Sequence, residues 1–326
     1  MIEIDLLLRI AVAFLKDMDL EEFKKLVFET TYLTSDINNF SNDKIPKDVK
    51  SSQNLYESSF EIHAPRQEAE ILLAFVLNTT RVDLHTNSKR EVNDFNKQRY
   101  FKLLALRKSG VPLEYLTNIA SFYSLEFYVD KNVLIPRVES EILVDKALEL
   151  IKEQGISEFV EIGVGSGALS LAILANNPTL NCIATDISSE AINIAKYNAE
   201  RLNLLNRIEF IESNLLDSKL LLDSIKKRGI TLVISNPPYI ANDYPLNKEV
   251  LCEPHIALFG GVKGDEILQN LILQCEQNRI KHLICEMGYD QKDSLQTFLL
   301  THNYNPRFYK DYAKHDRGFV ASLIES

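Results

Sequence analysis

The tetrapeptide Asn236-Pro237-Pro238-Tyr239 combines a polar amide, a rigid backbone and an aromatic ring. It follows an apolar run, residues 232–235, that is typical of a buried strand. Two prolines cannot donate backbone hydrogen bonds or continue a sheet, so the chain must leave in a rigid extended turn. The Asn oxygen and a neighbouring carbonyl can accept both hydrogens of one NH2 group, and the Tyr ring can face a planar group. We predict a holder that presents an amide or an exocyclic amine to an electrophile.

A glycine-rich loop, Gly163-Val164-Gly165-Ser166-Gly167, lies between a predicted strand (158–162) and a predicted helix (168–175). Glycines permit a tight turn and a close backbone approach to a ligand, and a helix N-terminus attracts an anionic group. With Ala168 the loop also fits the dinucleotide-binding pattern G-x-G-x-x-G/A. A purely structural turn is the alternative, but the position favours a loop that binds a nucleoside-containing cofactor.

Two further positions follow strands of the same series. Asp186 ends the second strand, where a carboxylate can accept hydrogen bonds from both hydroxyls of a ribose. The alternative role, capping the next helix, is already met by Ser188. Asn214 and Leu215 follow the third strand; there Asn could bind an adenine amino group and Leu could pack on its ring. A simple loop with an Asx turn is an equally open interpretation of that pair.

The glycine loop and Asp186 alone would also suit a dehydrogenase. Hydride transfer has no use for a rigid amine holder, whereas methyl transfer from S-adenosylmethionine needs a nucleophile held in line with an electrophilic methyl group. Acceptors on both hydrogens of an amide would localise electron density on its nitrogen and stabilise the positive charge that develops there. The six histidines show no metal-ligand spacing, so we predict no metal site.

Bulk properties limit the class of protein. The chain has 326 residues, enough for two domains, and its net charge of −10 argues against a dedicated nucleic-acid binder. The four cysteines are scattered without C-x-x-C spacing, which is typical of a reduced, cytoplasmic protein. No run of about 18 apolar residues could span a membrane, and the acidic start of the chain is unlike a signal peptide.

The first 117 residues are predicted to form a small helical domain. Helices are expected at residues 4–15, 68–77 and 92–108, the last with Phe95 on its apolar side. The polar stretch at about 21–60 is predicted to be a disordered insertion. Residues 118–136 are expected to form a β-hairpin linker, with strands at 122–129 and 133–135.

Residues 137–326 alternate between strands and helices. Strands are predicted at 158–162, 180–185, 208–212, 232–235 and 282–286, with two more between 307 and 324. Helices are predicted at 140–152, 168–175, 189–202, 265–277 and 291–300. This alternation indicates an α/β fold with a doubly wound, mostly parallel, seven-stranded sheet.

From about Ala64 to Ser326 the chain resembles the HemK/PrmC family, S-adenosylmethionine-dependent methyltransferases that modify the glutamine of the Gly-Gly-Gln tripeptide in class I peptide chain release factors. The resemblance includes the glycine loop, the Asn-Pro-Pro-Tyr turn and the segments Leu134–Arg137, Thr185–Ser188, Glu253-Pro254, Ala257–Gly261, Asp311–Ala313 and Asp316-Arg317. It implies the class I methyltransferase fold and methylation of the amide nitrogen (N5) of that glutamine.

The resemblance also implies roles for individual residues. Gly163 to Gly167 and Asp186 would bind S-adenosylmethionine, Asn236 to Tyr239 would hold the glutamine, and Asn236 would lie beside the cofactor's methyl end. Asn214-Leu215 departs from the family, whose members commonly have Asp followed by a large side chain. The segment at about 21–60 departs as well, since it looks inserted in the domain thought to grip the release factor.

Some interpretations stay open at this point. Glu253-Pro254 and Gly260-Gly261 either shape a wall of the site or only connect to the next helix. Five basic residues of the helix at 92–108 form either a solvated face or a docking surface for an acidic patch; they are Lys97, Arg99, Lys102, Arg107 and Lys108. An adenine-N6 or cytosine-N4 methyltransferase of nucleic acid could use the same tetrapeptide on a flipped base. A non-catalytic binding protein with this fold is a third hypothesis.

Overall fold

The structure is a computed structural model that describes residues 2–31 and 61–324. Two compact units divide the chain: Met1–Asn118 with Pro245–Cys252, and Ile119–Tyr244 with Glu253–Ser326. The second unit resumes at Glu253, so eight residues of the later sequence belong to the first, helical unit. In the described part no helix is both long and apolar enough to cross a membrane.

The smaller unit is helical around an apolar core. Its helices are α1 (Ile4–Lys16), α2 (Leu20–Thr31), α3 (Pro65–Leu77), α4 (Arg81–Thr86), α5 (Asp94–Lys108) and α6 (Leu113–Thr117). The short strands β1 (Ile2–Glu3) and β2 (Glu91–Val92) pair antiparallel. Helix α4 starts at a capping box between Thr80 and Asp83, in which each side chain accepts from the other residue's backbone amide. The predicted helices in this region are confirmed, with ends shifted by a few residues.

Three expectations for this unit were wrong. Residues 20–31 of the predicted insertion form helix α2, because Phe23 stacks on Phe14 with ring centroids 3.8 Å apart and thereby joins the core; residues 32–60 lie outside the described part. Phe95 is 73% exposed and does not face the core. The basic residues of α5 do not form one face either, since Lys97 and Arg107 are buried whereas Arg99 and Lys102 are exposed.

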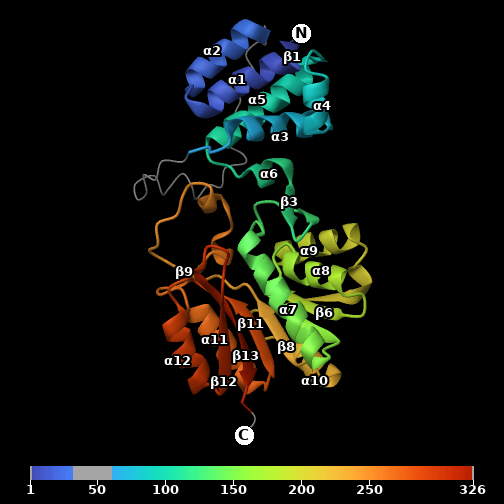
Figure 1. Ribbon diagram of the computed structural model, residues 1–326, viewed down its shortest axis with the longest axis vertical. Coiled ribbons are helices and arrows are strands. Elements are labelled where there is room, and N and C mark those ends of the chain that lie inside the picture. Colours follow the sequence, from blue (N-terminus) through green and yellow to red (C-terminus); the bar gives the residue numbers. More distant parts are fainter. Residues whose placement is uncertain (1, 32–60, 325–326) are drawn as a thin grey trace. The chain divides into compact units, whose positions relative to one another are not determined.

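A seven-stranded sheet organises the larger unit (Figure 1). Its strands are β5 (Glu158–Ile162), β6 (Asn181–Asp186), β7 (Ile208–Glu212), β8 (Leu232–Ser235), β11 (His282–Glu286), β12 (Tyr304–Lys310) and β13 (Asp316–Leu323). They lie in the order β12-β13-β11-β8-β5-β6-β7, and β13 runs opposite to the other six strands. The predicted doubly wound, mostly parallel sheet is therefore confirmed.

Helices cover both faces of this sheet. They are α7 (Glu141–Gln154), α8 (Ala168–Asn176), α9 (Ser189–Arg201), α10 (Lys219–Arg228), α11 (Glu266–Gln277) and α12 (Lys292–Thr301). Apolar side chains of α10, α11 and α12 share one core cluster with Val160, Val233 and Leu283 of the central strands. Helices α7, α8 and α9 also contact the strands but contribute no residue to that cluster, which places them on the opposite face of the sheet. Helix α10 was not predicted.

The hairpin before the sheet differs from the prediction. It consists of β3 (Ile119–Phe122) and β4 (Leu125–Tyr128), joined by Tyr123 and Ser124, whose φ angles are +49° and +62°. Positive φ at both central residues suits the twist of a two-residue hairpin, but Tyr-Ser is not the usual sequence for it. Residues 133–135 are not a strand. The hairpin packs on α9, where Asn198 exchanges two hydrogen bonds with the backbone of Tyr128 at 2.7 and 2.9 Å.

Candidate active site

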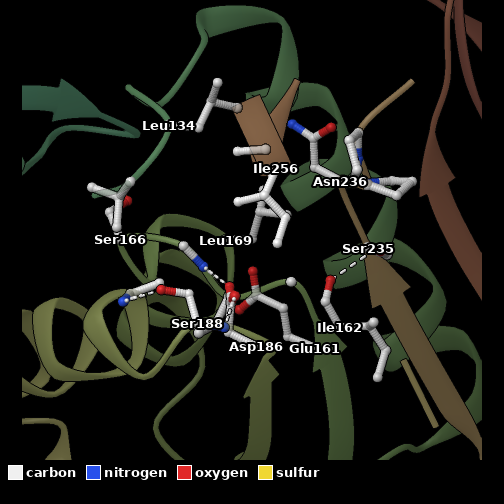
Figure 2. Close-up of a pocket in the computed structure, with 18 of the residues that line it drawn as sticks. Leu134, Glu161, Ile162, Ser166, Leu169, Asp186, Ser188, Ser235, Asn236 and Ile256 are labelled. Atoms are coloured by element: carbon white, nitrogen blue, oxygen red, sulfur yellow. Dashed lines mark hydrogen bonds between the residues drawn. The ribbon is translucent and has the colours of Figure 1, made fainter. Parts of the chain in front are cut away.

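A cavity opens at the carboxyl ends of β5, β6, β7 and β8 (Figure 2). Strand β5 pairs with β6 on one side and with β8 on the other, so the chain winds away from it in both directions. Open α/β sheets bind ligands at such a switch point. The loops after these four strands carry the glycine loop, Asp186, Asn214 and Asn236, and all four features line the cavity. The residues predicted from separate parts of the sequence are thus brought together.

The glycine loop needs its glycines for two different reasons. Gly163, Gly165 and Gly167 have φ angles of +76°, +53° and +84°, which L side chains rarely adopt. A Cβ added at Gly163 or Gly165 would meet no atom within 4 Å, so these two leave backbone open toward a ligand. A Cβ at Gly167 would lie 2.9 Å from the side chain of Leu171 and 3.4 Å from that of Ala195. The third glycine therefore serves helix packing.

Asp186 is held by backbone amides. The Gly165 amide donates to its Oδ2 and the Ser188 amide to its Oδ1, both at 2.9 Å. Burial raises the pKa of the Asp186 carboxyl, while these hydrogen bonds oppose the shift. Each oxygen retains acceptor capacity for a hydroxyl in the cavity. The Ser188 hydroxyl accepts from the Ala191 amide and caps α9, as predicted, so capping does not require Asp186.

Glu161 is a cavity residue that the sequence interpretation missed. It is 1% exposed, its Oε2 accepts from the Ser170 amide at 3.0 Å, and burial raises its pKa to about 8, with the Asp186 charge adding to the rise. Figure 2 shows its carboxyl group pointing into the cavity near that of Asp186. The signal was the acid between Val160 and Ile162, inside a strand predicted to be buried, where a charge is costly unless it has a partner or a use.

Asn214 and Leu215 reach the cavity from the end of β7. The Ser213 amide donates to the Asp186 carbonyl at 2.9 Å, which ties this loop to β6. The Asn214 side-chain nitrogen donates to the Asp217 carboxylate at 3.1 Å, and the Asp217 amide donates to the Asn214 carbonyl at 3.0 Å. These contacts form a backbone turn and not an Asx turn, in which the Asn oxygen would accept from a backbone amide. Leu215 has a φ of +49° and packs partly on the apolar core. Both residues are positioned beside a ligand, and their contacts with an adenine stay a prediction.

Asn236 lies in the cavity wall with its amide nitrogen engaged. Its Nδ2 donates to the Ser140 hydroxyl at 3.0 Å. Among the described residues no donor reaches its Oδ1 or the Pro237 carbonyl oxygen. Two acceptors of the rigid turn are therefore available in the same place. Pro237 and Pro238 also line the cavity.

Tyr239 does not lie where the sequence suggested. It is absent from the cavity lining, its hydroxyl donates to Glu286 at 2.9 Å, and its carbonyl accepts from Gln291 at 2.9 Å. The structure therefore does not place this ring against a substrate group, and such a contact stays a prediction. Glu286 is buried at the end of β11, and its hydrogen bond with the Tyr239 hydroxyl holds the tetrapeptide in place.

The two segments left open by sequence reasoning both support the site. Buried Glu253 forms an ion pair with Arg137 and accepts from the Ile135 amide at 3.0 Å, while Pro254 lines the cavity. Gly260 lies in β10 (Phe259–Gly261), which pairs with β9 (Ile240–Ala241) directly after the tetrapeptide. A Cβ on Gly260 would approach the Pro238 carbonyl oxygen to 2.6 Å. The first segment therefore shapes a wall, and the glycine pair braces the turn.

An apolar side of the cavity was also missed. It is formed by Leu134, Pro136, Ile187 and Ile256, of which Ile187 and Ile256 are about half exposed. Leu134 and Ile256 lie across the cavity from Asp186 in Figure 2. Apolar residues at this exposure can cover a flat ring. The described residues contain no cluster of His, Cys, Asp and Glu able to hold a metal ion.

Comparisons with known proteins agree with this geometry. Residues 52–117 match the PrmC N-terminal domain and residues 139–253 match the methyltransferase small domain. The hMettl16 catalytic domain, solved in complex with an RNA hairpin, has the same fold with a TM-score of 0.50 at 18% identity, over 72% of this chain and 83% of that one.

Curated relatives are considerably more similar. The release factor glutamine methyltransferase of Dictyoglomus turgidum is 41% identical over 63% of this chain and 71% of its own length. That of Clostridium acetobutylicum is 32% identical over 84% of this chain and 96% of its own length. A bifunctional methyltransferase of Rickettsia typhi is 32% identical over 90% of this chain, which spans 58% of that longer protein. This chain belongs to the family of release factor glutamine methyltransferases.

Proposed function

We propose that this protein transfers a methyl group from S-adenosylmethionine to the side-chain amide nitrogen (N5) of the glutamine in the Gly-Gly-Gln motif of class I peptide chain release factors. The observation that carries the proposal is the pair of available acceptors, Asn236 Oδ1 and the Pro237 carbonyl, on a rigid turn at the cavity wall. The names of the most similar curated relatives support the same substrate.

The cavity residues suit S-adenosylmethionine. Asp186 has acceptor capacity for two ribose hydroxyls, and the open backbone at Gly163 and Gly165 allows a close approach of the methionine portion. Leu215 and Ile187 can flank an adenine ring, with Asn214 at its edge. When bound, the cofactor supplies an electrophilic methyl group. Val164 and Ser166 complete the loop on the same side of the cavity.

The tetrapeptide performs the chemical positioning. Asn236 Oδ1 and the Pro237 carbonyl would each accept one hydrogen of the glutamine NH2 group. These two hydrogen bonds would fix the orientation of the amide and direct the nitrogen lone pair towards the methyl group. As the N–CH3 bond forms, positive charge grows on that nitrogen, and both oxygens stabilise it. One amide proton then leaves to solvent, so the products are N5-methylglutamine, S-adenosylhomocysteine and a proton. The hydrogen bond from the Tyr239 hydroxyl to Glu286 anchors the turn in this position.

We assign substrate recognition to the smaller, helical unit, much of which matches the PrmC N-terminal domain. We also place the reaction in the cytoplasm, where release factors act; the four cysteines are buried thiols, which suits a reducing compartment. No stable binding of nucleic acid or membrane is part of this proposal.

The test is a transfer assay with methyl-labelled S-adenosylmethionine. Release factor, its Gln→Ala variant at the Gly-Gly-Gln motif, and DNA or transfer RNA are offered in parallel to wild-type enzyme and to Asn236→Ala. We expect label only on the unmodified release factor, a loss of about 100-fold or more in Asn236→Ala, and an unchanged cofactor Kd in that variant. Label on nucleic acid alone, or full activity of Asn236→Ala, would overturn the proposal.

A further inference from the structure

A line of hydrogen bonds leads from Asn236 away from the cavity. Asn236 Nδ2 donates to Ser140 Oγ at 3.0 Å, Ser140 Oγ donates to Glu286 Oε2 at 2.5 Å, and the Tyr239 hydroxyl donates to Glu286 Oε1 at 2.9 Å. Ser140 and Glu286 are 3% and 1% exposed. The line therefore joins the segment before α7, the end of β8 and the end of β11 in surroundings that hold little water.

The direction of each hydrogen bond follows from the chemistry at the buried end. Burial raises the pKa of the Glu286 carboxyl, while the hydroxyls of Ser140 and Tyr239 and the charge of Arg317 oppose that rise by favouring the ionised form. An ionised carboxylate can only accept, and each oxygen of Glu286 lies within hydrogen-bond distance of one of these two hydroxyls. The single proton of Ser140 is then committed to Glu286. Ser140 Oγ can offer Asn236 only a lone pair, so Asn236 must turn its NH2 toward Ser140.

We propose that Ser140 and Glu286 are positioning residues that fix the orientation of the Asn236 amide, so that its oxygen and not its nitrogen serves the substrate. This inference rests on the proposed function. The oxygen and nitrogen ends of an Asn amide are nearly equal in size, so packing alone distinguishes them poorly. A reversed amide would set NH2 against the NH2 of the glutamine and remove one acceptor from the reacting nitrogen.

Three variants separate this role from general stabilisation. Ser140→Ala removes the hydroxyl that connects Asn236 with Glu286, whereas Ser140→Thr keeps a hydroxyl there. Glu286→Gln replaces a carboxylate oxygen with an NH2 group that can donate to Ser140. The Ser140 hydroxyl could then donate to Asn236, which would reverse the direction of both hydrogen bonds. The matched control is Ser322→Ala, which removes a serine hydroxyl bonded to His282 at the opposite end of β11. Cofactor Kd and thermal midpoint are measured for every variant.

The decisive readout is a change in substrate preference. Release factor in which the motif glutamine is replaced by glutamate carries two acceptor oxygens, which the wild-type Asn236 oxygen repels and a reversed NH2 would bind. We expect kcat to fall about 10-fold or more in Ser140→Ala and Glu286→Gln. In the same two variants, the inhibition constant of the glutamate factor should fall relative to the KM of the glutamine factor. Ser140→Thr and Ser322→Ala should keep both wild-type values.

The outcomes distinguish this inference from the proposed function. If wild-type enzyme does not label the glutamine factor, the proposed function fails. If wild-type enzyme does label it but Ser140→Ala keeps its kcat, or loses kcat without any change in the preference between glutamate and glutamine factors, the orienting role is overturned. A loss shared by Ser140→Thr would likewise overturn it, because that variant retains the hydroxyl.

Discussion

The Gly165 amide donates to the Asp186 carboxylate at 2.9 Å, so the loop after β5 and the end of β6 are fixed to each other. Asp186, the proposed acceptor for the ribose hydroxyls, therefore also fixes the conformation of the glycine loop, which is proposed to lie against the methionine portion of the cofactor. Asp186→Asn should raise the Kd for S-adenosylmethionine by about 10- to 100-fold, because an NH2 group would face a backbone N–H and one acceptor would be lost. Calorimetric titration of the ligand-free protein measures this.

A charge-matched control accompanies that titration. Glu190→Gln also removes one negative charge, from an exposed position in the first turn of α9. It should leave the Kd within about twofold of wild type, since exposed charges contribute little. Equal effects of the two variants would mean that Asp186 acts through net charge and not through its geometry.

The third loop glycine gives a prediction about stability. Gly167→Ala should lower the free energy of unfolding by more than Gly155→Ala, although both have positive φ, +84° and +64°. Gly155 ends α7 with nothing near a new Cβ, so Ala costs about 1 kcal/mol there through φ alone. At Gly167 the contact with Leu171 is added. Urea titration of both variants should show the difference; equal losses would contradict it.

The sheet and the polar ends of its strands could be predicted from sequence. Strands 158–162, 208–212, 232–235 and 282–286 were found with their observed bounds because each contains adjacent apolar residues, such as Phe159-Val160 and Leu283-Ile284, within a short segment. The fold class followed from their alternation with helices. Asp186 and Asn236 were recognised because strand ends converge on one edge whatever the details of packing.

Features that depend on tertiary contacts could not be predicted. The hairpin turn at Tyr123 and Ser124 has no Asn or Gly to reveal it. Ser140 and Glu286 are distant in sequence from Asn236 and meet it only in the folded sheet. Tyr239 carried the right chemistry for a substrate contact, but a buried acid on a neighbouring strand competes for its hydroxyl.

Arg107 gives a prediction about the helical unit. Its side chain is 5% exposed and pairs with Glu68 at 2.5 Å and with Glu249 at 2.9 Å. Arg107→Met should lower the free energy of unfolding by about 2–3 kcal/mol, because it leaves two partly buried carboxylates without their charged hydrogen-bond donor. The double variant Arg99→Ala/Lys102→Ala, at two exposed positions of the same helix, should lower the free energy of unfolding by less than about 1 kcal/mol. Denaturant titration compares them; similar losses would mean that Arg107 is a surface residue in solution.

Glu161 should make the free energy of unfolding of the ligand-free protein depend on pH. Its pKa is about 8 in the folded state and about 4.5 unfolded, so between these values the folded protein binds a proton that the unfolded chain has lost. The free energy of unfolding should therefore fall as pH rises from 4.5 to 8, by several kcal/mol at most, since a tenfold change in proton affinity corresponds to about 1.4 kcal/mol.

Glu161→Gln isolates this effect because the amide oxygen can still accept from the Ser170 amide and carries no charge. Compared with wild type, the variant should gain stability steadily between pH 5 and pH 8, with the smallest difference at the acid end. Urea titrations at several pH values measure that difference. The raised pKa of Asp186 acts in the same direction in both proteins, mainly through its burial. Parallel curves for the two proteins would show that Glu161 is already ionised in the folded state at neutral pH.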